Sequence, residues 1–186
     1  MPNHHFVVAV RCRLRAEAVP PAAGGCQHAY VETGRRCGRD LDVKGRHART
    51  CKIGGGVVAR HDRIRDWLAK FVGTMIGREA LTEQFVPHWD RHRDGALERA
   101  RLDVVFDNVQ GRRVHVDVAV VEASTADPHD QRQRAARDGA AASREEDVKR
   151  RRYPGPSLVP FVMESMGRLG EGADTLLRAI VPKDHL

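Results

Sequence analysis

The sequence predicts a domain that mixes helices with strands, of the α/β class, with α+β as the alternative. Residues 57–77 carry apolar side chains at helical spacing, among them Ile64, Leu68 and Phe71. Residues 101–121 hold two runs of alternating apolar residues around a short polar turn, which is typical of a β-hairpin. Helical and extended patterns follow one another along the chain, and this order indicates a mixed fold.

The other elements are predicted from shorter patterns. Residues 6–14 alternate loosely and predict a strand, and residues 15–25 are rich in Pro, Gly and Ala and predict a linker. The rest comprises an extended segment at 82–89, a charged loop at 90–100, a polar segment without apolar period at 122–136, a helix at 137–152, a strand at 158–164 and a short helix at 171–181.

The composition is basic and poor in lysine. The 186 residues include 32 Lys and Arg against 25 Asp and Glu, giving a net charge of +7, and five of the 32 are Lys. An arginine-rich surface suits nucleic acid, although a GC-rich gene would also favour Arg codons. No apolar run reaches the roughly 20 residues of a membrane span, and the apolar stretch near the N-terminus is too short for a signal peptide. An intracellular protein of the nucleus or cytoplasm, neither secreted nor in a membrane, is expected.

The hairpin pattern places two carboxylates together. With the turn centred on Gln110, one face is entirely apolar, and its opposed pairs are Leu102 with Val118, Val104 with Val116, and Phe106 with Val114. The other face then sets Asp103 opposite Asp117. Neighbouring carboxylates repel unless they are solvated, protonated or bridged by a cation, and an oxygen-rich pair suits Mg²⁺. Two solvated aspartates on an exposed face are the alternative.

Two further residues extend this candidate site. Glu83 lies upstream of the hairpin, and Lys149 lies on the predicted helix that follows it. Lys149 has Glu145 and Glu146 one turn earlier, so a surface ion pair is its simplest role. Lysine is scarce in this arginine-rich chain, and this favours a functional role for Lys149, because Lys, unlike Arg, can lose a proton or orient a water.

Three of the four cysteines lie in residues 26–56, a segment with little apolar periodicity. Cys26, Cys37, His47 and Cys51 form the spacing C-x10-C-x9-H-x3-C, which predicts a tetrahedral Zn²⁺ site. His28 is the alternative to Cys26, and unrelated thiols are the alternative to the whole site. A bound zinc would stabilise a segment that lacks a core of its own.

These segments, in this order, resemble the C-terminal part of LINE-type (non-LTR) retrotransposon polyproteins, where a Cys–Cys–His–Cys knuckle precedes a restriction-enzyme-like endonuclease domain. The matching pieces are CGRDLDVKGRHARTC, GGGVVARHDRIRDWL, TEQFVP, RLDVVF with VHVDVAVV, KRRRYPG and PFVMESMGRLG. The resemblance implies a strand and linker at 1–25, a zinc knuckle at 26–56 and a restriction-endonuclease-like domain at 57–186, with a mixed central sheet flanked by helices.

The resemblance also implies roles for the site residues. Asp103 and Asp117 would be the motif acids, Glu83 an additional acid, and Lys149, near Tyr153, a displaced motif lysine, because Ala119 stands at the usual lysine position. The implied activity is Mg²⁺-dependent nicking of target DNA for target-primed reverse transcription, by a fragment or separate piece of a larger element protein. DNA, and element RNA as a further partner, would meet a group of basic and aromatic side chains: Arg60, His61, Arg150, Arg151, Arg152 and Tyr153.

The main alternative function is a non-catalytic, zinc-containing nucleic-acid-binding module with a decayed nuclease site. An unrelated α/β protein is a third hypothesis.

Overall fold

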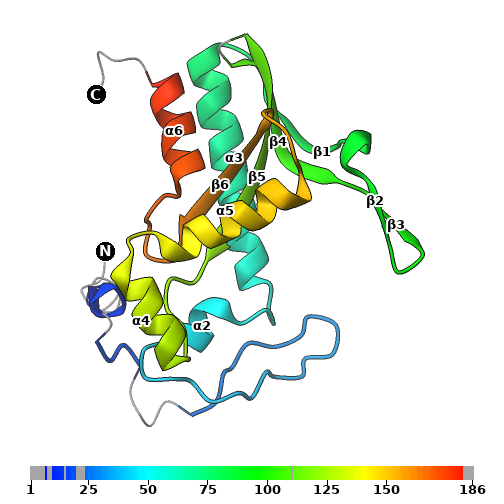
Figure 1. Cartoon of the computed structure of the whole chain (residues 1–186). Coiled ribbons are helices and arrows are strands. Elements are labelled where there is room, and N and C mark those ends of the chain that lie inside the picture. The colour runs from blue at the N-terminus through cyan, green and yellow to red at the C-terminus, as the bar shows by residue number, and fades with distance from the viewer. Residues whose placement is uncertain (1–6, 8–9, 15, 20–23, 110, 182–186) are drawn as a thin grey trace.

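A mixed four-stranded sheet forms the centre of the protein (Figure 1). The computed structural model describes residues 7, 10–14, 16–19, 24–109 and 111–181. In the spatial order β1-β4-β5-β6, the strands are β1 (Leu81–Phe85), β4 (Arg101–Val109), β5 (Arg112–Val121) and β6 (Leu158–Glu164). The first three pair antiparallel, and β6 runs parallel to β5, so the sheet is mixed as expected.

Helices flank this sheet on both faces: α3 (Gly56–Ile76), α5 (Ala140–Arg152) and α6 (Glu171–Ile180) pack on its strands. Helix α4 (Pro128–Ala136) packs against α5, and α2 (Arg46–Thr50) lies in the cysteine–histidine segment. One core cluster joins α3 and α6 to the sheet through Val116 and Val118 of β5. Because side chains alternate along a strand, Asp117 points to the other face, where α5 contacts β5 and β6. Within the described ranges, no helix has the length and apolar character needed to cross a membrane.

Helix α3 follows the predicted apolar stripe. Leu68 and Val72 are fully buried, and Ile64, Phe71 and Ile76 pack against the same cluster. Gly77 ends the helix with φ of 66°, a left-handed conformation that favours glycine. The predicted helix over 57–77 is therefore confirmed.

The predicted hairpin and its register are confirmed at the centre of the pair. Val104 opposes Val116, Val105 opposes His115, and Phe106 opposes Val114. Leu102 departs from the prediction, because it packs in a second cluster instead of with Val104. That second cluster contains Val86, Trp89, Ala100, Leu102 and Leu158, with Tyr153 against it. The regular pairing of β4 with β5 ends at Val104. Beyond this point the strand register no longer requires Leu102 to pack in the same cluster as Val104.

Three predicted segments differ from the structure. In the segment at 6–14, Val7 and residues 10–13 are helical, not extended, and the Leu14 N–H bonds to the Val10 carbonyl as in a helical turn. The predicted loop at 90–100 contains a hairpin, β2 (Arg91–Arg93) and β3 (Ala96–Glu98). The polar segment at 122–136 contains α4, whose first N–H groups bond to the Asp127 carboxylate.

The predicted strand at 158–164 and the short helix at 171–181 correspond to β6 and α6. Ala173 and Leu176 face the core, as the pattern indicates.

Candidate active site and metal centre

The four predicted zinc ligands come together near the N-terminus. The ligand atoms of Cys26, Cys37, His47 and Cys51 all lie within 4.8 Å of one another. The Sγ atoms of Cys26 and Cys51 are 3.8 Å apart, and Cys37 Sγ lies 3.4 Å from His47 Nε2. Zn–S bonds of about 2.3 Å at tetrahedral angles give S···S separations of about 3.8 Å. The cluster therefore has dimensions that zinc could fill.

The structure selects Cys26, not His28, as the fourth member of this group. Cys26 and Cys51 are buried, and desolvation raises the pKa of the Cys51 thiol. A hydrogen bond from the Arg39 backbone N–H lowers the pKa of Cys37. Zinc binding would favour the thiolate at both positions, because the metal replaces the proton.

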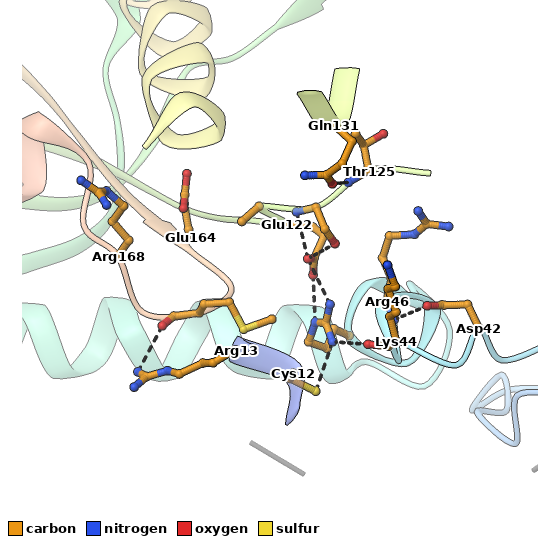
Figure 2. A pocket seen from close by; sticks show the side chains of 14 residues that line it. Cys12, Arg13, Asp42, Lys44, Arg46, Glu122, Thr125, Gln131, Glu164 and Arg168 are labelled. Atoms are coloured by element: carbon orange, nitrogen blue, oxygen red, sulfur yellow. Dashed lines mark hydrogen bonds and ion pairs between the residues drawn. The ribbon is translucent and has the colours of Figure 1, made fainter. Parts of the chain in front are cut away.

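The knuckle is fastened to the sheet by a two-pronged ion pair. Arg49 Nε and Nη2 lie 2.9 and 3.1 Å from the two carboxylate oxygens of Glu122, the residue directly after β5. Arg49 is on α2, two residues after His47. A cavity of about 330 Å³ surrounds this contact and is lined by the knuckle, the N-terminal segment, the residues after β5, α4 and the segment from the end of β6 onward (Figure 2). Cys12 lies here, 3.4 Å from Arg49 Nη1 and outside the zinc group.

Asp103 and Asp117 are both buried, with 9% and 7% of their surface exposed, so they are not the solvated pair of the alternative interpretation. Burial, and then the neighbouring Asp103 carboxyl group, raise the pKa of Asp117, so the two acids influence each other's ionisation. Asp103 Oδ2 accepts a hydrogen bond of 2.6 Å from the Val118 N–H, which is a backbone group of the neighbouring strand. The site thus lies where the regular pairing of β4 with β5 ends.

Lys149 reaches this pair from α5. Its Nζ is 2.9 Å from Asp117 Oδ2 and 3.9 Å from Glu145, so the buried acid is the nearer partner. Burial raises the pKa of Asp117 to about 6, although Lys149 opposes the shift. Burial disfavours the charge on Lys149, but the Asp117 carboxylate outweighs it and raises the pKa of Lys149. Asp117 Oδ2 is therefore a buried oxygen whose partner is the Lys149 ammonium group.

His61 reaches Asp103, and not Asp117, from α3, which covers the face of the sheet opposite to α5. Its Nε2 lies 3.2 Å from Asp103 Oδ2, and its Nδ1 lies 3.2 Å from Asp62. The hydrogen bond with Asp103 raises the pKa of His61 to about 9. Burial would raise the pKa of Asp103, but bonds from His61 and Val118 lower it. The sequence suggested a phosphate contact for His61, and nothing in its spacing indicated the contact with Asp103.

The structure does not bring Glu83 to the two aspartates. Its carboxylate pairs with Arg65 of α3 and with Arg101, whose Nε is 2.8 Å away. Glu83 also has φ of 55°, a conformation uncommon outside glycine. Over the described residues, the cysteine–histidine cluster is the one group of three or more potential metal ligands.

Among the residues predicted to bind nucleic acid, some have polar or ring contacts with other described residues and others have none. Arg152 Nη1 donates to the Trp89 carbonyl at 2.9 Å and Tyr153 packs on the Trp89 ring, so both have structural contacts. Arg150 pairs with Glu146 of its own helix at 3.3 Å. Arg151 is exposed, and Arg60 carries a buried Nε without a hydrogen-bond partner.

A cavity of about 340 Å³ opens beside Asp117. Apart from Val148, its lining is charged or aromatic: Arg91, Asp117, Glu145, Lys149, Arg151, Arg152 and Tyr153. Basic side chains therefore surround an acid–lysine pair, an arrangement that favours an anionic ligand.

Comparison with known proteins gives no match, either to a family model or to a curated protein.

Proposed function

We propose that the chain is a Mg²⁺-dependent DNA endonuclease with a restriction-endonuclease-like fold. The observation that carries this proposal is the contact of Lys149 Nζ with Asp117 Oδ2 at 2.9 Å, next to Asp103. Asp117 of the hairpin and one of five lysines in the chain line one cavity, and Asp103 lies next to Asp117. Two carboxylates and a cation beside a basic rim suit phosphodiester hydrolysis.

Each residue has a separate role in this proposal. Asp103 and Asp117, two buried carboxylates, would hold the metal. When bound, Mg²⁺ supplies polarisation of the phosphoryl oxygen and a lowered pKa of its water. Lys149 orients the attacking water or stabilises the negative charge that develops on the phosphate. Arg151, exposed at the cavity rim, binds a backbone phosphate of the DNA.

The biological setting follows from the resemblance. A nick that leaves a 3′ hydroxyl would prime reverse transcription, and the zinc knuckle would precede the nuclease in a larger element protein. The mixed sheet with helices on both faces supports this proposal.

The second candidate is a non-catalytic zinc-containing module that binds nucleic acid. Glu83 favours it, because the additional acid of the implied site is neutralised by Arg65 and Arg101 instead of facing the aspartates.

Supercoiled plasmid incubated with the zinc-loaded protein and Mg²⁺ tests the proposal. Asp117→Ala and Lys149→Met are expected to lower the nicking rate about 100-fold or more. Lys70→Met, which changes an exposed lysine of α3, is the matched control and should nick at the wild-type rate. Nicking that persists in Asp117→Ala contradicts the proposal. A wild-type protein that binds plasmid but leaves it intact favours the second candidate.

A further inference from the structure

The β2–β3 hairpin is an arm with almost no packing of its own. Of its six strand residues, five are exposed, and Glu98 is the exception. The strands form a separate two-stranded sheet that projects from the body (Figure 1). Asp94 and Gly95 form the turn with φ of 51° and 79°, which gives the arm a tight end.

The base of this arm is held firmly against the candidate active site. Asp90 Oδ1 accepts the Ala100 N–H at 2.7 Å and closes the base. The Trp89 indole donates to the Pro154 carbonyl at 2.9 Å, and Arg152 of α5 bonds to the Trp89 carbonyl. Arg152 and Lys149 share one helix, so the arm has a fixed position relative to the acids.

The arm carries two arginines and two acids, and the arginine beside the turn is the more exposed of the two. Arg91 pairs with Glu98 at 2.8 Å and also lines the cavity that holds Asp117. Arg93 is 70% exposed, and its contact is a long one of 3.6 Å to Asp94, itself 93% exposed. His92 is exposed opposite Leu97. An exposed arginine next to a polar turn suits the hydrogen-bonding edges and phosphates of nucleic acid.

The dimensions of the arm suit duplex DNA. Three-residue strands at about 3.4 Å per residue reach about 10 Å from the base. The major groove of B-DNA is about 12 Å wide and 8.5 Å deep, and it admits a two-stranded ribbon. The deep, narrow major groove of A-form RNA does not admit side chains in this way.

From these contacts we propose that the β2–β3 arm enters the major groove of duplex DNA, with Arg93 at its contacting end. The arm deepens the endonuclease proposal and rests on it, because it would orient the duplex so that a backbone phosphate meets the acid–lysine cavity. Arg91 lies at the junction of the arm and that cavity.

Binding to a fluorescein-labelled 30-base-pair DNA duplex, measured by anisotropy with zinc but without Mg²⁺, tests the arm independently of cleavage. Arg93→Gln is expected to weaken binding at least threefold and to lower the salt dependence by about one counterion. Arg132→Gln removes an exposed arginine of α4, away from the arm, and should change binding less than 1.5-fold. The substituted side chain is exposed, so both variants should retain the wild-type melting temperature.

Three outcomes would contradict the proposal that the arm enters the DNA groove. They are equal losses in Arg93→Gln and Arg132→Gln, an Arg93→Gln effect as large on an RNA duplex of the same sequence, and no duplex binding by the wild type at low salt. If the wild type leaves plasmid intact but Arg93→Gln still weakens DNA binding, the endonuclease proposal is rejected and the proposed DNA contact of the arm is supported.

Discussion

Arg49 and Glu122 join the cysteine–histidine segment to the end of the strand that carries Asp117. The two side chains are 18% and 10% exposed, and both prongs of the guanidinium meet the carboxylate. Glu122 also accepts hydrogen bonds from the backbone and hydroxyl of Ser124. A shielded pair with this geometry holds one segment of the chain in register with another, 73 residues away.

Breaking this pair should destabilise the protein. Arg49→Met leaves the Glu122 carboxylate largely buried without its cation, so we expect a loss of about 2–3 kcal/mol in the free energy of unfolding. Urea denaturation of the zinc-loaded protein measures it. Arg178→Met removes the exposed partner of Asp174 in α6 and should cost about 0.5 kcal/mol or less. An Arg49→Met/Glu122→Gln double variant should recover part of the loss. If Arg49→Met is as stable as Arg178→Met, the role given to Arg49 is refuted.

Zinc content should follow the four-ligand cluster. Cys37→Ser and Cys26→Ser remove thiolates, so protein recovered from gel filtration should hold well under one zinc per chain. His28→Ala and Cys12→Ser lie outside the cluster and should retain one zinc. Elemental analysis measures the metal. Loss of zinc in His28→Ala, with zinc retained in Cys26→Ser, would reverse the assignment of the fourth ligand.

Stability should depend on pH through His61. Its pKa is raised to about 9 from an ordinary 6.5, so the folded state holds the proton more tightly than the unfolded state. The resulting stabilisation is complete below pH 6.5 and is lost as the pH rises to 9. Since the side chain is 29% exposed, solvent reduces its size to about 2 kcal/mol.

The measurement compares unfolding free energies of the wild type and His61→Gln from pH 6 to pH 9.5, with zinc and without Mg²⁺. The difference between them should shrink across this range. His129→Gln, an exposed histidine of α4, is the control and should follow the wild type. If the difference in unfolding free energy between wild type and His61→Gln stays constant across this pH range, the proton on His61 adds nothing to stability.

Two adjacent arginines should give opposite results. Arg152 is 12% exposed and bonds to Trp89 and Glu98, so Arg152→Ala should lower the unfolding free energy by about 2 kcal/mol. Arg151 is exposed at the cavity rim, so Arg151→Ala should leave stability within about 0.5 kcal/mol and weaken DNA binding. Denaturation and anisotropy separate the two effects. If Arg151→Ala but not Arg152→Ala lowered the unfolding free energy, the structural role would belong to Arg151 instead of Arg152.

The elements with strong periodicity could be predicted from the sequence. The apolar stripe of α3 and the alternation in β4 and β5 identify both the elements and their buried sides, because one face must be covered. The β2–β3 hairpin and α4 were missed because they bury little and give no apolar period. Their signals were local ones, an Asp–Gly turn at 94–95 and a capping Asp127 before Pro128.

The candidate site could be predicted only in part. The hairpin pattern predicted Asp103 opposite Asp117, whereas the observed pairing of β4 with β5 stops one residue short of this pair, at Val104 with Val116. The cysteine–histidine spacing predicted the cluster that the structure contains. The contacts of His61 and Glu83 depend on how α3 crosses the sheet, and the spacing of residues along one chain does not encode that crossing. Lys149 was singled out by its rarity and by a resemblance, and the fold then supplies its contact with Asp117.

The two tryptophans of the chain lie in contrasting places, which gives the protein an internal optical probe. Trp67 is half exposed and stacks on Phe71 with ring centroids 5.1 Å apart, so its emission reports the solvent side of α3. Trp89 is 5% exposed at the root of the arm, 5.4 Å from the Tyr153 ring. Changing Trp67 to Phe would leave a single tryptophan, whose emission, excited selectively, follows the arm and its neighbouring cavity when DNA is added.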